Sequence, residues 1–469
     1  MGLRIYNTLT RRKEEFVPLH GRRVTMFVCG ITPHDETHVG HAKTYVAFDV
    51  VARYLRYKGY SVFYVQNVTD IEDRLIEKIE TLKRDWKDIV SEYWHAYEEA
   101  MAALRCDSVN LYAWATDYMP EIVAQIEGLI DRHFAYVADG NVYFDTTKFL
   151  GWGKLSGQKV EDHLPGARVA VDERKRNPAD FSLWKSKKPG EPAWESPWGP
   201  GRPGWHIEDT AITVRLLGPQ YDLHGGAAEL KFPHHEAEIA QAESFTGVKP
   251  FVRYWMHGGM LMVKGEEMHK SLGNFWTVAD ALKRVSPEEL RFYLLNAHYR
   301  SPIDFTLEGL DESKTAYRRI LESHENVLAA ERGARDSGPG DAALRTAAKA
   351  AVDKFIESMD DDFNTREAIA AIYELVATAN RGLNRGIGRE TARAALEAFG
   401  VFDQVLALFP RAAGGTEGTL AGVLDFIVQL REDARKRKDF ATSDGIRARL
   451  AELGVVLEDT KDGVRWKVR

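Results

Sequence analysis

The first seventy positions read as two apolar strands separated by an amphipathic helix. Residues 23–29, RVTMFVC, are apolar and β-branched as a buried strand should be, and residues 60–70 repeat that character. Between them, residues 41–59 carry apolar side chains at helical spacing and end at a glycine: Tyr45, Phe48, Val51, Leu55 and Gly59. This order predicts a right-handed βαβ unit in a parallel sheet. Ligands of such sheets bind beyond the carboxyl ends of the strands, here residues 29–41 and 67–70.

The rest of the chain changes pattern several times. The successive stretches are helical residues 80–135, short strands rich in Pro and Gly at 140–204, a second α/β stretch at 205–263 with a helix begun after Pro233, and helices from 280 to 410 interrupted at 331–341. A flexible joint at 411–419 precedes a terminal unit that starts helical and ends in a hairpin turning near 462–463. We expect the stretch at 140–204 to be an insertion, after which the chain rejoins the first sheet.

Composition narrows the class of protein. The 469 residues are 44% apolar and 28% charged with a net charge of −7, which predicts several globular domains and excludes general coating of nucleic acid. No apolar run approaches the length of a membrane span, and the first sixteen residues lack the apolar stretch of a signal peptide. Two cysteines, Cys29 and Cys106, are too few for a disulfide framework. We therefore expect a cytoplasmic protein that does not enter a membrane.

Two short polar sequences are suited to phosphate. Thr37 to His41, THVGH, puts two imidazoles and a small glycine at the start of a helix, where free N–H groups and the helix dipole favour an anion. The alternative is a helix cap with two exposed histidines. Residues 267–274, EMHKSLGN, hold Lys270 in a loop, where it could place a positive charge on departing phosphate oxygens or simply be solvated.

A third group consists of potential metal ligands. Cys29 ends a strand, Asp209 lies in GWHIEDT, and His234 and Glu238 are four residues apart on one helix face. Zinc accepts sulfur, nitrogen and oxygen ligands of these kinds, and one thiolate with two carboxylates leaves a formal charge of −1 around Zn²⁺. Taken separately, the same residues would be a buried strand cysteine and a polar helix face.

Together these sequences resemble the cysteinyl-tRNA synthetases, a family of class I aminoacyl-tRNA synthetases, over nearly the whole chain. HVGH at 38–41 resembles the HIGH signature of the class, and EMHKS at 267–271 resembles its KMSKS loop. The blocks in family order are FVCGITPHDETHVGHAKTY, YVQNVTDIEDRLI, GRPGWHIE, LHGGAAELKFPHHEAEIAQAE, MDDDFNTREAIAAIYEL and RKRKDFATSDGIRARLAELGVVLEDTKDGVRW.

The resemblance implies a fold and a division of the chain. The fold is α/β: a class I Rossmann-like parallel-sheet catalytic domain with an insertion, followed by a helical bundle and a small C-terminal α+β unit. The implied segments are the catalytic domain at 1–125 and 205–263, a connective insertion at 126–204, a KMSKS-loop and stem-contact region at 264–320, a bundle at 321–410 and an anticodon-binding unit at 411–469.

The resemblance also implies a reaction and its cofactors. L-cysteine would be activated with ATP and Mg²⁺ to cysteinyl-adenylate and transferred to the 3′ end of tRNA(Cys) by a monomeric enzyme. The implied catalytic and ATP-binding residues are Thr37, His38, Gly40, His41, Lys270 and Ser271. Zinc held by Cys29, Asp209, His234 and Glu238 would receive the thiolate of the substrate, with Thr69 and Trp205 completing the substrate pocket. Binding to a metal separates a thiol from the hydroxyl of serine better than pocket shape does.

Two departures from the family pattern change the expectation. Asp209 stands where the family has a second cysteine, so a hard oxygen replaces a soft sulfur; we expect zinc to bind less tightly, with Asp209 or alternatively His206 completing the ligand set. Glu267 and His269 replace the first Lys and the Ser of the KMSKS loop, which predicts slower activation unless Lys264 substitutes in part.

The terminal unit is locally basic. Residues 431–449 hold seven basic and four acidic side chains, a net charge of +3 that suits contacts with RNA phosphates or a solvated helix face. The resemblance to an anticodon-binding unit favours RNA, and the candidate contacts are Arg431, Arg435, Lys438, Arg447 and Trp466.

Two other functions fit part of the pattern. A cysteine ligase of mycothiol biosynthesis activates cysteine for an amino sugar, and CGITP before HVGH resembles its sequence, although that enzyme ordinarily lacks the terminal unit found here. A degenerate paralogue that binds RNA without catalysis would explain Glu267, His269 and Asp209, but the chain retains His38, His41 and Lys270.

Overall fold

A computed structural model describes residues 2–158, 173–268, 274–332, 336–410, 416–437, 439–460 and 463–468. The chain forms two compact units, Met1–Leu408 and Phe409–Arg469. Among the residues described, none of the helices is both long and apolar enough to cross a membrane.

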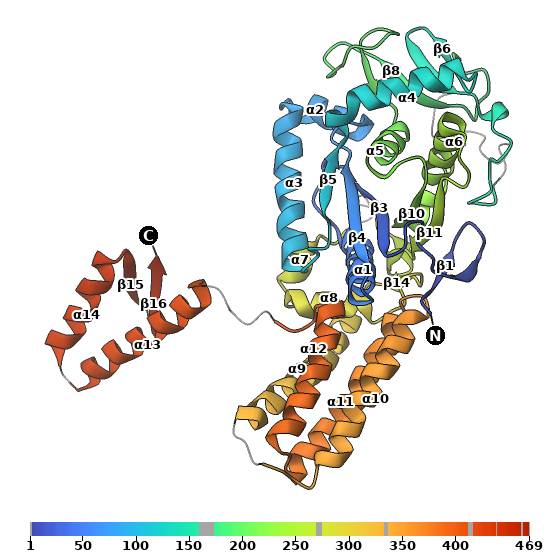
Figure 1. The fold of residues 1–469 in the computed structure, drawn as a ribbon. Coiled ribbons are helices and arrows are strands. Elements are labelled where there is room, and N and C mark those ends of the chain that lie inside the picture. The colour runs from blue at the N-terminus through green and yellow to red at the C-terminus, as the bar shows by residue number, and fades with distance from the viewer. Residues whose placement is uncertain are drawn as a thin grey trace. The chain divides into compact units, whose positions relative to one another are not determined.

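A five-stranded parallel sheet forms the centre of the first unit (Figure 1). Its order is β11-β10-β3-β4-β5, with β3 at Arg23–Ile31, β4 at Ser61–Val68, β5 at Leu111–Trp114, β10 at Tyr221–Ala227 and β11 at Val252–Gly258. Helix α1, Val39–Tyr57, connects β3 to β4, and its predicted apolar stripe is buried. The βαβ unit and the α/β class I fold expected from the sequence are confirmed. The chain adds β4 and β5 on one side of β3 and then β10 and β11 on the other side. The strand order therefore reverses between β3 and β10, the position at which open parallel sheets bind ligands.

One expectation for this region was wrong. Residues 80–135 are not continuously helical, because β5 lies between the helices of this stretch and forms one edge of the sheet. The helices are α2 at Asp73–Leu82, α3 at Trp86–Ala103 and α4 at Met119–Asp131. Strand β6 then begins at the end of the same stretch.

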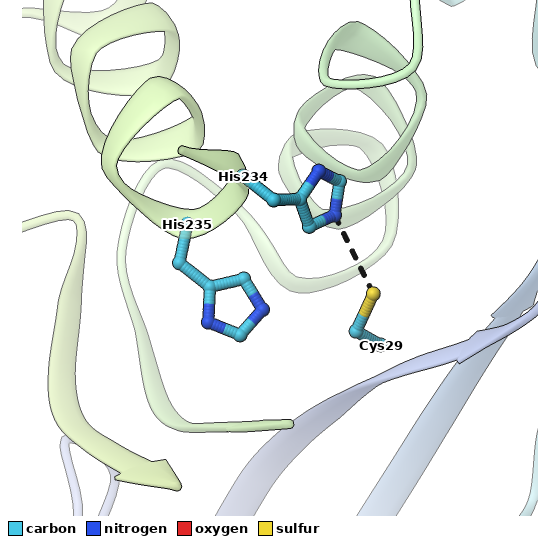
Figure 2. Close-up of side chains that lie close together, drawn as sticks. All are labelled: Cys29, His234 and His235. Atoms are coloured by element: carbon cyan, nitrogen blue, oxygen red, sulfur yellow. Dashed lines mark hydrogen bonds between the residues drawn. The ribbon is translucent and has the colours of Figure 1, made fainter. Parts of the chain in front are cut away.

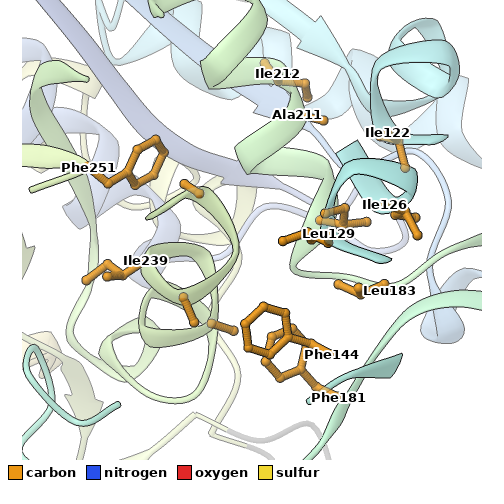
Figure 3. Packing of buried hydrophobic residues seen from close by; sticks show 14 of the residues in the cluster. Ile122, Ile126, Leu129, Phe144, Phe181, Leu183, Ala211, Ile212, Ile239 and Phe251 are labelled. Carbon is orange, nitrogen blue, oxygen red and sulfur yellow. The ribbon is translucent and has the colours of Figure 1, made fainter. Parts of the chain in front are cut away.

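The insertion forms its own antiparallel sheet of β6, β7, β8 and β9, at Ala135–Ala138, Asn141–Phe144, Phe181–Ser186 and Gly201–Pro203. Helices α5, Ile207–Leu217, and α6, His234–Thr246, bring the chain back to the parallel sheet, and α6 begins directly after Pro233 as predicted. Apolar side chains of α4, α5, α6 and the inserted sheet form one buried cluster with Phe27 and Val65 of the parallel sheet (Figure 3). This shared core fixes α5 and α6, the two helices that carry candidate metal ligands.

The N-terminal segment covers the other edge of the parallel sheet. β1, Arg4–Asn7, pairs with β2, Arg12–Glu15. Just beyond β1, the Thr8 N–H donates to Trp255 O at 2.9 Å, while the Asn7 side chain donates to Arg253 O at 2.8 Å and accepts from Trp255 N at 3.1 Å. These bonds occupy backbone groups of edge strand β11.

Helices follow the parallel sheet. The intervening short elements are β12 at Leu261–Val263, β13 at Glu266–Glu267, α7 at Val278–Leu282, α8 at Pro287–Leu295 and β14 at Ile303–Asp304. The bundle consists of α9 at Leu307–Arg332, α10 at Asp341–Asp360, α11 at Thr365–Arg385 and α12 at Arg389–Leu406. Helices α4 and α9 run through the boundaries that the sequence placed at 125/126 and 320/321.

A buried arginine ties the bundle to helices that pack on the parallel sheet. Arg291, on α8, is 1% exposed and donates to Leu406 O at the end of α12 and to Leu104 O after α3, both at 2.6 Å. Its third partner is Asp49 on α1, at 2.5 Å. One guanidinium therefore joins four helices of the first unit.

The second unit contains α13 at Thr416–Lys436, α14 at Phe440–Glu452, β15 at Val455–Thr460 and β16 at Gly463–Val468. The two strands pair antiparallel, with Thr460 opposite Gly463, which confirms the predicted hairpin; residues 461–462 lie outside the described part of the chain. Its core includes Leu424, Leu450, Val455 and Leu457.

Candidate active site

The four predicted metal ligands meet at the carboxyl end of β3. Cys29 ends the apolar part of that strand, Asp209 lies in the first turn of α5, and His234 and Glu238 lie one turn apart on α6 (Figure 2 shows Cys29 and His234). The Nε2 atom of His234 is 3.4 Å from Cys29 Sγ, 3.0 Å from Asp209 Oδ2 and 3.1 Å from Glu238 Oε1. Cys29 Sγ also lies 3.4 Å from Asp209 Oδ2.

These four side chains are buried, and their ionisable groups lie close together. Asp209 and Glu238 are 1% and 0% exposed. Burial, reinforced by the two carboxylates, raises the pKa of the Cys29 thiol well above its ordinary value. Burial and the charge of Asp209 likewise raise the pKa of Glu238. Neither carboxylate oxygen of Glu238 makes a hydrogen bond within the described residues; Oε1 faces His234, and Oε2 lies 3.6 Å from His224 Nδ1. A cation at this point would satisfy them and favour the thiolate.

The side chains of His206 and Trp205 contact the ring of His234. His206 Nδ1 lies 2.8 Å from His234 Nδ1, and the indole of Trp205 stacks on the His234 ring with centroids 4.3 Å apart and an interplanar angle of 18°. Because one ring nitrogen of His234 faces His206, the other is directed at Cys29 and Asp209. Asp209 thus lies on the Nε2 side of His234 with Cys29 and Glu238, whereas His206 lies on its Nδ1 side.

Further buried histidines lie next to this group. His235 Nδ1 is 2.8 Å from His257 Nε2, and His257 Nδ1 is 2.9 Å from Thr8 Oγ1, so a chain of hydrogen bonds runs from the N-terminal segment to α6. His224 of β10 stacks on Trp255 with centroids 4.2 Å apart. Burial lowers the pKa of all three histidines well below the ordinary value, which keeps them neutral. Sequence analysis missed this set, although the adjacent histidines of PHHE and the histidine of LHGG were visible signals.

Asn67, at the end of β4, lies in the stretch 67–70 that the sequence placed at the ligand-binding end of the sheet, but its contact with Asp209 was not predicted. Its Nδ2 donates to Asp209 Oδ1 at 2.6 Å and to Thr69 Oγ1 at 3.2 Å, and its Oδ1 accepts from Gly30 N–H at 2.5 Å. Thr69, predicted in the substrate pocket, is 3% exposed. Asn67 therefore joins the candidate metal group to the predicted substrate pocket.

The predicted phosphate-binding residues lie at the start of α1. His38 is the N-cap of the helix, its Nδ1 accepts from His41 N at 3.2 Å, and the two rings stack with centroids 3.6 Å apart. Burial lowers the pKa of His38 to about 4 and that of His41 well below its ordinary value, so both imidazoles are neutral near pH 7. A Cβ on Gly40 would lie 2.9 Å from His38 Nδ1, so a larger residue there would displace the His38 ring. Thr37 O accepts from Val278 N at 2.8 Å.

Lys270 and Ser271 lie outside the described residues, as does His269. The residues on either side of them contact the start of α1. The Phe275 ring packs edge-on against His38 with centroids 5.4 Å apart, and a Cβ on Gly40 would lie 3.1 Å from Met268 Cε. Both flanks of the predicted KMSKS-like loop are therefore next to the HVGH sequence.

The predicted RNA contacts differ in accessibility. Arg435 and Arg447 are exposed, whereas Arg431 is 2% exposed and lies 3.4 Å from Glu432 Oε1, so its burial in the unit contradicts a role at the surface. Lys438 lies outside the described residues, and the side chain of Trp466 is likewise not described.

Three parts of the chain match models of known protein families. Residues 15–315 match the model of the class I (C) tRNA synthetase catalytic domain, residues 354–410 a DALR domain, and residues 425–466 the cysteinyl-tRNA ligase anticodon binding domain. A cysteine–tRNA ligase of Pelotomaculum thermopropionicum is 45% identical over 99% of both chains, and one of Thermococcus onnurineus is 43% identical over 100% of this chain and 99% of its own.

Solved structures show the same fold at low identity. Mycobacterium tuberculosis methionyl-tRNA synthetase bound by methionyl-adenylate superposes with a TM-score of 0.60 at 15% identity, covering 82% of this chain and 90% of that one. Because the catalytic model covers most of the chain and the relatives match it end to end, the chain belongs to the cysteine–tRNA ligase family of class I aminoacyl-tRNA synthetases.

Proposed function

We propose that the protein is a cysteine–tRNA ligase that activates L-cysteine with ATP and transfers it to the 3′ end of tRNA(Cys). The observation that carries this proposal is the buried group of Cys29, Asp209, His234 and Glu238 on the same sheet edge as the HVGH helix start. A thiol-selecting pocket and an anion-binding helix end thus lie at the carboxyl ends of neighbouring elements.

The four residues fit zinc. Ligands at zinc bond lengths of about 2.0–2.3 Å in a tetrahedron lie about 3.3–3.7 Å apart. The distances from His234 Nε2 to the other three ligand atoms are 3.0, 3.1 and 3.4 Å, so a small outward movement would accommodate the ion. The Glu238 oxygens, which lack donors among the described residues, support this fit. When bound, zinc supplies a Lewis acid that favours the thiolate of the substrate over the hydroxyl of serine.

The neutral histidines at the start of α1 suit a positioning role. His38 and His41 would hold the ATP phosphates by hydrogen bonds together with the free N–H groups of the helix, since neither imidazole is charged near pH 7. Mg²⁺ and Lys270, assisted by Ser271, would then supply the positive charge that stabilises the negatively charged pyrophosphate as it leaves. The flanking contacts of Met268 and Phe275 support a loop position next to this site.

The reaction needs no covalent enzyme intermediate. The carboxylate of cysteine attacks the α-phosphorus of ATP, and the bond to pyrophosphate breaks. A terminal ribose hydroxyl of the tRNA then attacks the adenylate carbonyl and releases AMP. Thr69 would bind the polar end of the amino acid, and Trp205, which stacks on His234, would form the wall beside its side chain. Catalysis rests on position and electrostatics.

Recognition of tRNA is proposed for the second unit. Arg435 and Arg447 are exposed on its two helices and are candidates for phosphate contacts, along with Lys438 and Trp466, while Arg431 is omitted because it is buried. Earlier segments, the KMSKS-loop region at 264–320 and the bundle at 321–410, would support the body of the tRNA.

Cysteine-dependent ATP–pyrophosphate exchange tests the first step, with serine as the control amino acid. We expect exchange with cysteine and at least about a hundredfold less with serine. Charging of a tRNA(Cys) transcript, compared with an amino-sugar acceptor, tests the second step and separates this function from a mycothiol-type ligase. Absence of exchange in zinc-replete protein would instead support a non-catalytic RNA-binding paralogue.

A further inference from the structure

We propose that Asn67 is a positioning residue that fixes Asp209 as a single-oxygen zinc ligand. The inference rests on the proposed zinc site and concerns how this chain accommodates a carboxylate there. Asn67 lies at the end of β4, the strand that pairs with the strand of Cys29, and is 1% exposed. Its side chain reaches the metal group through Asp209, so its influence on zinc would be indirect.

The backbone fixes which way the Asn67 amide faces. Strand β3 pairs with β4 in register up to Val28 and Gln66, and the register shifts before Ile31 and Val68. In this irregular stretch Gly30 N–H points at Asn67 Oδ1, 2.5 Å away. An N–H group requires an acceptor, so the oxygen of the amide must face Gly30 and its NH₂ group must face the other way.

The NH₂ group makes the two oxygens of Asp209 unequal. Asn67 Nδ2 donates to Asp209 Oδ1 at 2.6 Å, a short bond of the kind that carboxylates form with amide donors. The other oxygen, Oδ2, lies 3.0 Å from His234 Nε2 and 3.4 Å from Cys29 Sγ. One oxygen is therefore held by the protein, and the other is turned toward the site of the ion.

This arrangement is useful for a carboxylate and unnecessary for a thiolate. A carboxylate can turn about its bond to present either oxygen or both, whereas a cysteine offers one sulfur, which is a weak hydrogen-bond acceptor. Partners of this kind orient metal ligands, and their removal typically weakens metal binding about 10–100-fold. Asn67 should matter for zinc only as long as residue 209 is an aspartate.

A double-mutant cycle on the full-length protein tests this dependence. Zinc affinity is measured by competition with a chromophoric chelator for wild type, Asn67→Ala, Asp209→Cys and the double variant, and the absorption spectrum of Co²⁺ in the same proteins reports on the ligand geometry. We expect Asn67→Ala to weaken zinc binding about 10–100-fold in the wild-type background, and less than about threefold in the Asp209→Cys background. The Co²⁺ bands should shift with Asn67→Ala only in the aspartate background.

Two controls separate positioning from folding. Asn141→Ala removes another buried asparagine, which bonds the insertion sheet, and should leave zinc affinity unchanged. Asn67→Leu has nearly the same volume but neither donates nor accepts a hydrogen bond, so it should also weaken zinc binding if Asn67→Ala proves unstable. Equal losses in both backgrounds, or no loss, would overturn the positioning role. A wild-type protein that binds no zinc would overturn the zinc proposal itself, and this inference with it.

Discussion

Gly30 of β3 lies close to the backbone of β4, and replacing it with alanine probes the geometry of the whole site. A Cβ at this position would lie 1.7 Å from the backbone oxygen of Asn67 and 2.8 Å from its carbonyl carbon. Because both atoms belong to a strand of the central sheet, no side-chain rotation relieves the contact. The strands would have to separate by roughly 1.3 Å to restore a normal contact of about 3 Å.

The energetic effect follows from two losses. Overpacking of a buried position costs about 1–3 kcal/mol, and the Gly30–Asn67 hydrogen bond contributes about 1 kcal/mol more. We therefore expect Gly30→Ala to destabilise the first unit by about 2–4 kcal/mol and to lower its Tm by about 2–5 °C. The displacement also moves Cys29, the neighbouring residue, whose sulfur lies 3.4 Å from both Asp209 and His234. Zinc content and cysteine-dependent exchange should fall together, exchange by at least about tenfold.

The matched control is Gly400→Ala. Gly400 lies within α12, and a Cβ there has nothing within 4 Å, so the same chemical change adds helix propensity without a clash. We expect an unchanged or slightly raised Tm and wild-type exchange. Differential scanning calorimetry gives the Tm of both variants, and metal analysis gives their zinc content. If Gly30→Ala keeps wild-type Tm and zinc content, the close approach of the strands does not set the site geometry.

Three further predictions concern other parts of the first unit. Arg291→Met leaves the buried carboxylate of Asp49 without the Arg291 guanidinium and should destabilise the protein by about 3–5 kcal/mol in urea unfolding. The control Lys283→Met removes an exposed ion pair with Asp280 and should leave the urea midpoint unchanged. Similar effects of the two substitutions would contradict the role of Arg291 as a tie between helices. Because burial lowers the pKa of His38 to about 4, the unfolded chain takes up its proton first, so the stability from this group is complete above about pH 6.5 and is lost as pH falls toward 4. His38→Asn should therefore lose stability less steeply across that range, and an unchanged slope would refute the assignment. Glu267→Lys restores a lysine to the KMSKS-like loop and should give pyrophosphate exchange at least as fast as wild type, so slower exchange would show that the loop does not need a second positive charge.

The sequence predicts those parts of the fold in which local pattern and tertiary environment agree. The stripe of α1 is buried because its apolar residues recur at the helical period, and α6 begins after Pro233 because proline suits the start of a helix. Strand β5 escaped prediction because its four residues, LYAW, are too short to show a period and lie between long helices. Its strand conformation comes from pairing with β4, and this pairing cannot be read from the local sequence pattern.

The candidate site likewise contains residues that the sequence could predict and residues that it could not. His234 and Glu238 could be paired from their spacing on one helix, and the family pattern supplied Cys29 and position 209. The sequence placed Asn67 at a ligand-binding strand end but could not give its contact with Asp209, because that contact depends on a register shift between two strands. The burial of Arg431 was equally invisible, since a run of basic residues does not reveal which of them faces the core.

The segment around Thr8 has a consequence for handling the protein. By bonding to Trp255 and Arg253, residues 7 and 8 close the edge of β11, a strand whose apolar side chains are buried. An unprotected edge of this kind is a template for pairing with another chain. A preparation that has lost its first eight residues to proteolysis would therefore tend to self-associate into aggregates, and intact N-terminal mass is a sensible quality check before any kinetic comparison.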